Sequence, residues 1–251
     1  MKHDILYFRK IQDACDAQTK KQAQLNGLRK RISRDFKQPL NWEQVEVNGT
    51  EQDLLVMKST ETSVKKIEAR PGERLHLGDL IKWNDVFWLI VSLDADHQVQ
   101  YAGTMKQCNM VLRWQMPDRS IYETYAVTED ATKYGSGVTD TTLMRIGEFS
   151  LKAKVQMNDY TLQIKRDQRF LVGESSALHE PNAYITSRIN QVTGTYVTVE
   201  NGVQRNYGYI EVTMLEDQFR PHIDRADLMI ADYVEINDQT DSAEGTGGVG
   251  W

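Results

Sequence analysis

A few residues of this 251-residue chain have types and spacing that could support catalysis or metal binding. Asp94, Asp96 and His97 lie together in the run SLDADHQ, and carboxylates beside a histidine can hold a divalent cation. A tight turn explains the same run, because aspartate suits turn backbones, and we favour that interpretation. Cys108 could act as a nucleophile, but it falls on the apolar side of a predicted strand, where cysteine usually packs inertly. We therefore expect no catalytic residue and no metal site.

The familiar sequence motifs of enzymes are absent. The chain contains no GxxxxGK[ST], no GxGxxG after a predicted strand, no HExxH and no GxSxG. Its five histidines are scattered, and Cys15 and Cys108 cannot form a disulfide framework or a four-thiolate zinc site. We expect a non-enzymatic protein without a cofactor. A hydrolase stays open as an alternative, because a glycosidase needs only two carboxylates.

Tryptophans offer a different chemistry, because their rings can form a platform on which a sugar stacks. Candidates for such a platform are Trp42, Trp83, Trp88 and Trp114, but Trp88 and Trp114 lie in apolar strand patterns that favour packing in a core. We expect Trp83, Trp88, Cys108 and Trp114 to fill one small barrel core.

Basic and acidic residues are separated along the chain, whose formal net charge is −6. Residues 1–38 hold ten basic and four acidic residues, whereas residues 222–251 hold seven acidic residues and one basic residue, Arg225. Positive charge is densest at Arg29, Lys30, Arg31 and Arg34, which we expect to contact a neighbouring subunit. A solvated helix face and a nucleic-acid contact remain alternatives.

The N-terminal part of the chain has the periodicity of a helix. Apolar residues at helical spacing over residues 4–37 predict a helical arm within 1–38, which Pro39 ends. One uninterrupted helix would be about 50 Å long. A body of 200 residues is only about 40 Å across. Such a helix therefore either overhangs its own domain or breaks near the polar stretch Asp16–Gln24 into a helical hairpin.

After Pro39 the hydrophobic pattern changes to a period of two. Tight turns are predicted at Asn48-Gly49, Asn84-Asp85 and Asn201-Gly202, and many short strands between such turns predict small antiparallel barrels or sandwiches. We therefore expect a mainly β fold with an N-terminal α-helical arm. The expected organisation is a helical arm, a β-barrel-like domain, a polar loop or linker, a second β domain and an acidic Gly-rich tail, over residues 1–38, 39–130, 131–141, 142–233 and 234–251.

The chain also lacks the sequence features of membrane and secreted proteins. Its mean hydropathy is −0.56. No apolar run approaches the roughly 20 residues of a membrane span, and the start resembles no signal peptide. We expect synthesis in a reducing cytoplasm and no membrane partner.

One run of residues resembles a known family over Pro71–Gln115. It combines paired turn residues, a Trp-Leu-Ile strand and a Cys-Asn pair before a strand that ends in Trp-Gln: Pro71-Gly72, Gly78-Asp79, Trp88-Leu89-Ile90, Gly103, Met105, Cys108-Asn109 and Trp114-Gln115. This pattern resembles a domain of structural proteins from tailed bacteriophages that infect Gram-positive bacteria. We expect Asn109 to satisfy backbone groups at a strand or bulge.

The resemblance spans most of residues 40–233. Further matching segments are Asn41–Gly49, Glu129-Asp130, Thr132–Gly135, Arg169–Val172, Glu216–Gln218 and Ile230–Tyr233. It implies a virion component of the head–tail connector, such as a head-closure (stopper) or adaptor protein, made in the host cytoplasm and placed at the head–tail junction. It supplies no catalytic residues.

From this resemblance we expect a homo-oligomeric ring that binds portal or adaptor and tail proteins, with packaged DNA as a further contact in the channel without sequence specificity. The polar loop after the first β domain is expected to face the channel or a neighbouring subunit through Glu129, Asp130, Lys133, Tyr134 and Gly135. The alternative is a capsid decoration protein or a baseplate or tail binding module.

Overall fold

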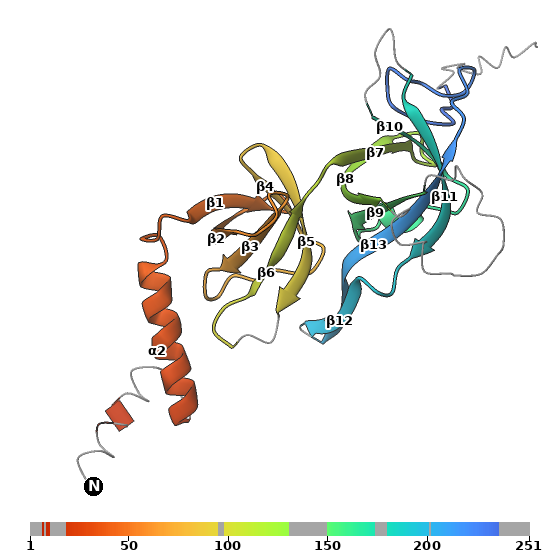
Figure 1. The fold of residues 1–251 in the computed structure, drawn as a ribbon. Coiled ribbons are helices and arrows are strands. Elements are labelled where there is room, and N and C mark those ends of the chain that lie inside the picture. The colour runs from red at the N-terminus through yellow and green to blue at the C-terminus, as the bar shows by residue number, and fades with distance from the viewer. Residues whose placement is uncertain are drawn as a thin grey trace, which may run out of the picture.

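A computed structural model of the chain describes residues 7, 9–10, 19–94, 98–130, 150–173, 180–200 and 202–235. The helix α2 (Lys20–Asp35) precedes two antiparallel β-sheets that lie one after the other along the molecule (Figure 1). The fold is therefore mainly β, with an N-terminal helix that is shorter than the arm expected from the sequence.

The first sheet is a closed barrel of six strands. Its order is β1-β2-β3-β6-β5-β4, with β1 (Trp42–Val47), β2 (Thr50–Lys58), β3 (Val64–Ala69), β4 (Leu80–Trp83), β5 (Val86–Asp94) and β6 (Ala102–Gln107). Two-residue turns join β1 to β2 and β4 to β5, and their central residues all have positive φ: Asn48 49°, Gly49 81°, Asn84 51° and Asp85 60°. Such turns match the twist of the strands they connect, so these short signals determine the two hairpins.

The second sheet has seven strands and curls almost into a barrel. The strands follow the order β10-β11-β13-β9-β8-β7, with β12 paired to β13; their bounds are β7 (Met110–Gln115), β8 (Ile121–Asp130), β9 (Ser150–Gln156), β10 (Arg169–Val172), β11 (Asn182–Asn190), β12 (Thr195–Glu200) and β13 (Val203–Asp217). The end strands β7 and β10 contact each other. Trp114 of β7 meets Phe170 of β10 edge to face, with ring centroids 5.8 Å apart.

The division between the two sheets differs from the expected boundary at residue 130. It falls at Cys108 and Asn109, between β6 and β7, because β8 pairs with β9 through Ala126↔Val155 and its neighbours. Ala126 and Val155 are both fully buried in the second core. Period-two patterning predicts a strand but not the sheet that it joins, so β7 and β8 were assigned to the wrong domain.

The two sheets enclose separate hydrophobic cores, which corrects the expectation of one core for four residues. Trp88 is buried in the first core, and Trp83 packs against it with ring centroids 5.7 Å apart. Trp114 belongs to the second core, and Cys108 is half-buried between the two sheets. The burial of Trp88 and Trp114 confirms their packing role and removes them from a sugar-binding surface.

The helix α2 begins later than the periodicity predicted. Thr19 has an extended backbone, with φ −130° and ψ 155°, and its side chain accepts a hydrogen bond from the N–H of Gln22. This N-cap starts the helix within the polar stretch, so a single helix over residues 4–37 is wrong, and a helix starts within the stretch Asp16–Gln24 where the alternative placed a break. Residues 11–18 lie outside the described part of the chain.

Candidate interaction surfaces

The C-terminal end of α2 is fixed to the first barrel. Phe36 is buried, and the ammonium group of Lys37 lies 3.3 Å from a carboxylate oxygen of Asp53. The same carboxylate accepts hydrogen bonds from the indole N–H of Trp42 at 3.2 Å and from Arg70 at 3.3 Å. Because the buried Asp53 carboxylate is surrounded by donors, it holds the helix end to the barrel at one defined place.

The rest of α2 presents positive charge. The helix carries six basic residues and one acidic residue, and Ala23 is its one buried position. Arg29 donates from Nε to the carbonyl of Gln98 in its own barrel at 3.1 Å, and Arg34 pairs with its neighbour Asp35 at 2.9 Å. Lys30 and Arg31 are exposed. Of the four residues expected to contact a neighbour, Arg29 and Arg34 are thus both engaged within their own chain.

Aromatic rings, an amide and two glycines join the sheets. Phe87 of β5 stacks on Tyr125 of β8 with centroids 3.7 Å apart, and Gln156 donates to the side-chain oxygen of Asn48 at 2.7 Å. A Cβ on Gly78, whose φ is +83°, would lie 1.8 Å from the carbonyl oxygen of Gly208. No side chain fits there, so Gly78 allows the two backbones to approach.

Glu129, expected to face the channel or a neighbouring subunit, bridges the two sheets of its own chain. Its carboxylate accepts from Lys106 of β6 at 2.7 Å and from Lys154 of β9 at 3.2 Å. These hydrogen bonds, that from Lys106 foremost, lower the pKa of the Glu129 carboxyl below its usual value. Of the other loop residues, Asp130 ends β8 in register with Leu151, and Lys133, Tyr134 and Gly135 lie outside the described residues.

Asn109 of the Cys-Asn pair supports the start of the second sheet. Its side-chain oxygen accepts from the backbone N–H of Thr128 at 2.8 Å and from the hydroxyl of Thr128 at 3.0 Å. Asn109 thus satisfies a backbone group beside a strand, as the sequence predicts.

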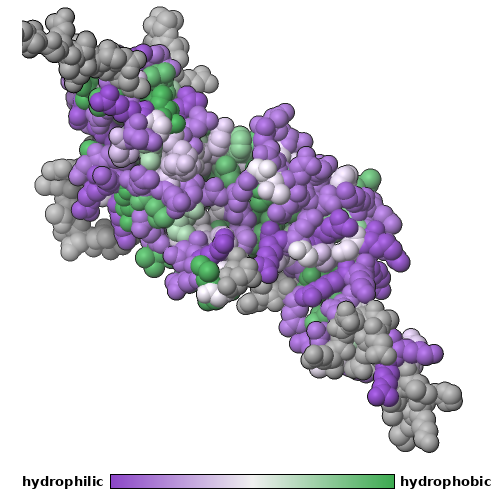
Figure 2. All heavy atoms as spheres, turned by 180° about the vertical axis from the view of Figure 1, so that it is seen from behind, coloured by the Kyte–Doolittle hydropathy of each residue, from purple (hydrophilic) through white to green (hydrophobic). Residues whose placement is uncertain are grey.

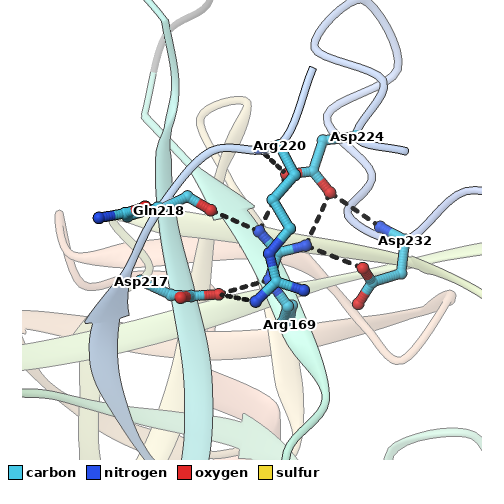
Figure 3. Close-up of polar contacts among 6 residues, drawn as sticks. All are labelled: Arg169, Asp217, Gln218, Arg220, Asp224 and Asp232. Atoms are coloured by element: carbon cyan, nitrogen blue, oxygen red, sulfur yellow. Dashed lines mark hydrogen bonds and ion pairs between the residues drawn. The ribbon is translucent and has the colours of Figure 1, made fainter. Parts of the chain in front are cut away.

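A buried arginine organises the far end of the second sheet (Figure 3). The Arg169 guanidinium contacts both carboxylate oxygens of Asp224 at 2.8 and 2.9 Å, and it also bonds Asp232 at 2.8 Å and Asp217 at 2.5 Å. Its remaining N–H donates to the carbonyl of Gln218 at 2.7 Å. All five guanidinium donors are therefore used. The side chain of Arg169 is 2% exposed and that of Asp224 is fully buried.

This cluster fastens the C-terminal segment 218–235 to the sheet. The Asp224 carboxylate also accepts the backbone N–H groups of Arg220 at 2.7 Å and Asp232 at 3.0 Å. Farther on, the amide of Gln115 binds both backbone groups of Val234, at 2.9 and 3.1 Å. Arg169, Asp217 and Asp232 lie within segments of the resemblance, but the sequence alone assigned them no role. The sequence does contain one signal for this cluster. Arg169 is a charged residue at the start of the apolar run RFLV, which indicates a buried charge that needs partners.

The acid cluster predicts a loss of stability at low pH. Burial alone raises the pKa of the Asp224 and Asp217 carboxyls. The hydrogen bonds from Arg169, the hydrogen bonds from backbone N–H groups and the arginine charge together outweigh burial, so both pKa values lie below the ordinary 3.8. The stabilisation is therefore complete above pH about 4 and is lost as pH falls through the lowered values. Melting temperatures measured from pH 7 down to pH 2 should fall below pH 4, and Arg169→Ala should flatten that fall. If the melting temperature of Arg169→Ala fell equally steeply below pH 4, the acid sensitivity would not come from the Arg169 cluster.

Exposed valines on the β12–β13 hairpin were missed by the sequence analysis. Val197, Val199 and Val203 are 61%, 70% and 57% exposed. Among the described strands, β12 pairs with β13 alone. The face drawn in Figure 2 is mainly hydrophilic and shows hydrophobic residues in small separate patches.

The described residues contain no group of three or more His, Cys, Asp or Glu side chains that could hold a metal ion. Asp94 is exposed, and Asp96 and His97 fall outside the described ranges. Burial raises the pKa of the Cys108 thiol to about 12, which keeps it protonated and unreactive at neutral pH. No helix in the described part of the chain is long and apolar enough to cross a membrane.

Comparison with known proteins gives no family. No family model and no curated protein matches the chain. One solved structure, titled "MrkH, A novel c-di-GMP dependence transcription regulatory factor", aligns at 6% sequence identity over 79% of this chain and 84% of that chain. Its TM-score is 0.25, a likeness too low to carry an argument about fold or function.

Proposed function

We propose that the protein is a non-enzymatic subunit of the head–tail connector of a tailed bacteriophage, either a head-closure (stopper) or an adaptor protein. Its copies form a ring between portal and tail and help to retain packaged DNA. The resemblance over most of residues 40–233 supplies the class of protein. The placement of opposite charges on the molecule supports an assembly role.

That placement is the observation on which the proposal rests. The basic helix α2 lies at one end of the molecule, and the C-terminal segment lies at the other (Figure 1). The C-terminal segment 218–235 holds four acidic residues and two basic residues, Arg220 and Arg225. Opposite charges at opposite ends favour a head-to-tail contact between copies, and such heterologous contacts close into a ring when the rotation between neighbours allows it.

Immunogold labelling tests the location. Antibody against this chain, applied to phage particles from a lysate that produces it, should label the neck between head and tail. Label over the head or at the tail tip would instead support the decoration or baseplate alternative. Particles without label would overturn a role in the virion.

Charge reversal on α2 tests the subunit contact. The double variant Lys30→Glu/Arg31→Glu should reduce assembly into particles about tenfold or more, because like charges would replace opposite ones in each contact, and each tenfold corresponds to about 1.4 kcal/mol. Lys58→Glu/Lys66→Glu, exposed on the first barrel, is the matched control and should assemble normally. Equal incorporation of both variants, measured by quantitative immunoblot of purified particles, would exclude α2 from the interface.

A further inference from the structure

A pocket of about 590 Å³ opens at the end of the second sheet, beside the Arg169 cluster. Its walls come from the end of β7 and the following turn, from the short helix η2 (Thr161–Gln163) and its flanks, and from the fastened C-terminal segment. The apolar part of the lining includes Trp114, Met116, Leu162, Ile164 and Val234. The pocket is therefore an extension of the second core that opens to solvent.

Two large apolar residues on its walls are only partly covered. Leu162 is 43% exposed and Val234 is 57% exposed. Exposed apolar surface that adjoins a core and is rimmed by polar groups is typical of a site where another segment docks.

The rim of the pocket carries two basic side chains that form no ion pair with any described residue. Arg119 and Lys165 line it, and neither side chain has an ion-pair partner in the described part of the chain. Arg169 and Asp232 also line the pocket, but they pair with each other at 2.8 Å, and the five donors of Arg169 are already used. An occupant that suits this rim combines acidic and apolar side chains.

The continuation of the chain has that composition and starts at the pocket wall. Residues 236–251 contain the acids Asp238, Asp241 and Glu244, no Lys or Arg, and a tryptophan, Trp251. The clamp of Gln115 on Val234 places the start of this segment two residues from the lining. Sixteen residues reach about 50 Å when extended, which is ample for the segment to turn back into the pocket.

We propose that residues 236–251 dock in the pocket of their own subunit. Trp251 packs against the apolar wall at Leu162, and the acidic residues lie beside Arg119 and Lys165. Docking in the same chain is favoured because the short connection from Val234 gives the segment a high effective concentration at the pocket. The inference does not depend on the proposed connector role.

Fluorine NMR of the full chain labelled with 5-fluorotryptophan tests the proposal. Trp251→Phe assigns the Trp251 resonance, and a synthetic peptide of residues 236–251 supplies the reference for a free segment. The Trp251 resonance of the full chain should differ from that of the peptide and be protected from a soluble paramagnetic agent. A resonance that matches the peptide in both respects would overturn the proposal.

Variants in the full chain locate the contact. Leu162→Asp should return the Trp251 resonance to the position of the peptide, and Arg119→Glu/Lys165→Glu should weaken docking about tenfold. Leu40→Asp and Lys58→Glu/Lys66→Glu, on exposed positions away from the pocket, are the controls and should leave the docked resonance unchanged. A docked resonance that is indifferent to Leu162→Asp would exclude this pocket. A docked fraction that falls on dilution would show that the occupant is the tail of a second copy and would overturn docking within one subunit.

Discussion

Arg169→Ala should lower the free energy of unfolding of the second sheet by about 3–5 kcal/mol, as expected when a buried ion pair loses one partner. Removing the guanidinium leaves the Asp224 carboxylate, which is fully buried, facing two backbone N–H groups without a cation. The bonds to Asp217 and Asp232 are lost with it, so the C-terminal segment loses the contacts that fasten it.

Amide hydrogen exchange separates this effect from a general loss of stability, because it reports each region independently. Exchange should accelerate in β10–β13 and in residues 218–235, and remain unchanged in β1–β6. Arg113→Ala is the matched control: Arg113 of β7 forms an exposed ion pair with Glu123 at 2.8 Å outside the segment, so its removal should leave exchange as in the parent protein. Equal exchange in the two variants would show that the cluster does not fasten the segment.

A double variant identifies Asp224 as the residue through which Arg169 acts. Arg169→Ala leaves the buried Asp224 carboxylate without its cation. If this causes the loss of stability, the double variant Arg169→Ala/Asp224→Ala should lose clearly less free energy of unfolding than the two single variants together. Strict additivity, measured by urea unfolding, would assign the cost to lost packing of the arginine stem instead.

Trp88→Ala should have the second large effect, about 3–5 kcal/mol, through the cavity that it leaves in the first core. The Trp88 ring is buried beside Trp83, among residues such as Ile90 and Met105 that are fully buried. Hydrogen exchange should accelerate in β1–β6, the opposite pattern to that of Arg169→Ala. An unchanged melting curve would contradict the placement of Trp88 in the core.

The matched variant for this position is Trp88→Phe. The indole N–H of Trp88 is buried and has no hydrogen-bond partner among the described residues. Replacing Trp88 by phenylalanine therefore removes no hydrogen bond. Its cost should therefore be well below that of the alanine variant. A loss as large as that of Trp88→Ala would show that the shape of the indole, rather than apolar volume, is what the core requires.

The sequence by itself determined the local features of this protein. Asn48-Gly49 and Asn84-Asp85 predicted two tight hairpins, and the structure has positive φ at all four positions. Period-two patterning predicted a mainly β fold, and the apolar setting of Trp88 and Trp114 predicted their burial. These features depend on the φ/ψ preferences of neighbouring residues and on the alternation of their side chains, so a few consecutive residues are enough to predict them.

The tertiary structure decided which strands share a sheet and which charges meet. Strand β8 could have closed the first barrel by its pattern alone, yet it pairs with β9 across residues that the sequence treats as a linker. Arg169 gathers Asp217, Asp224 and Asp232 from 48 to 63 residues away. Such partners are chosen by which arrangement buries the most apolar surface while satisfying every buried polar group, and that balance is a property of the whole chain rather than of any segment of it.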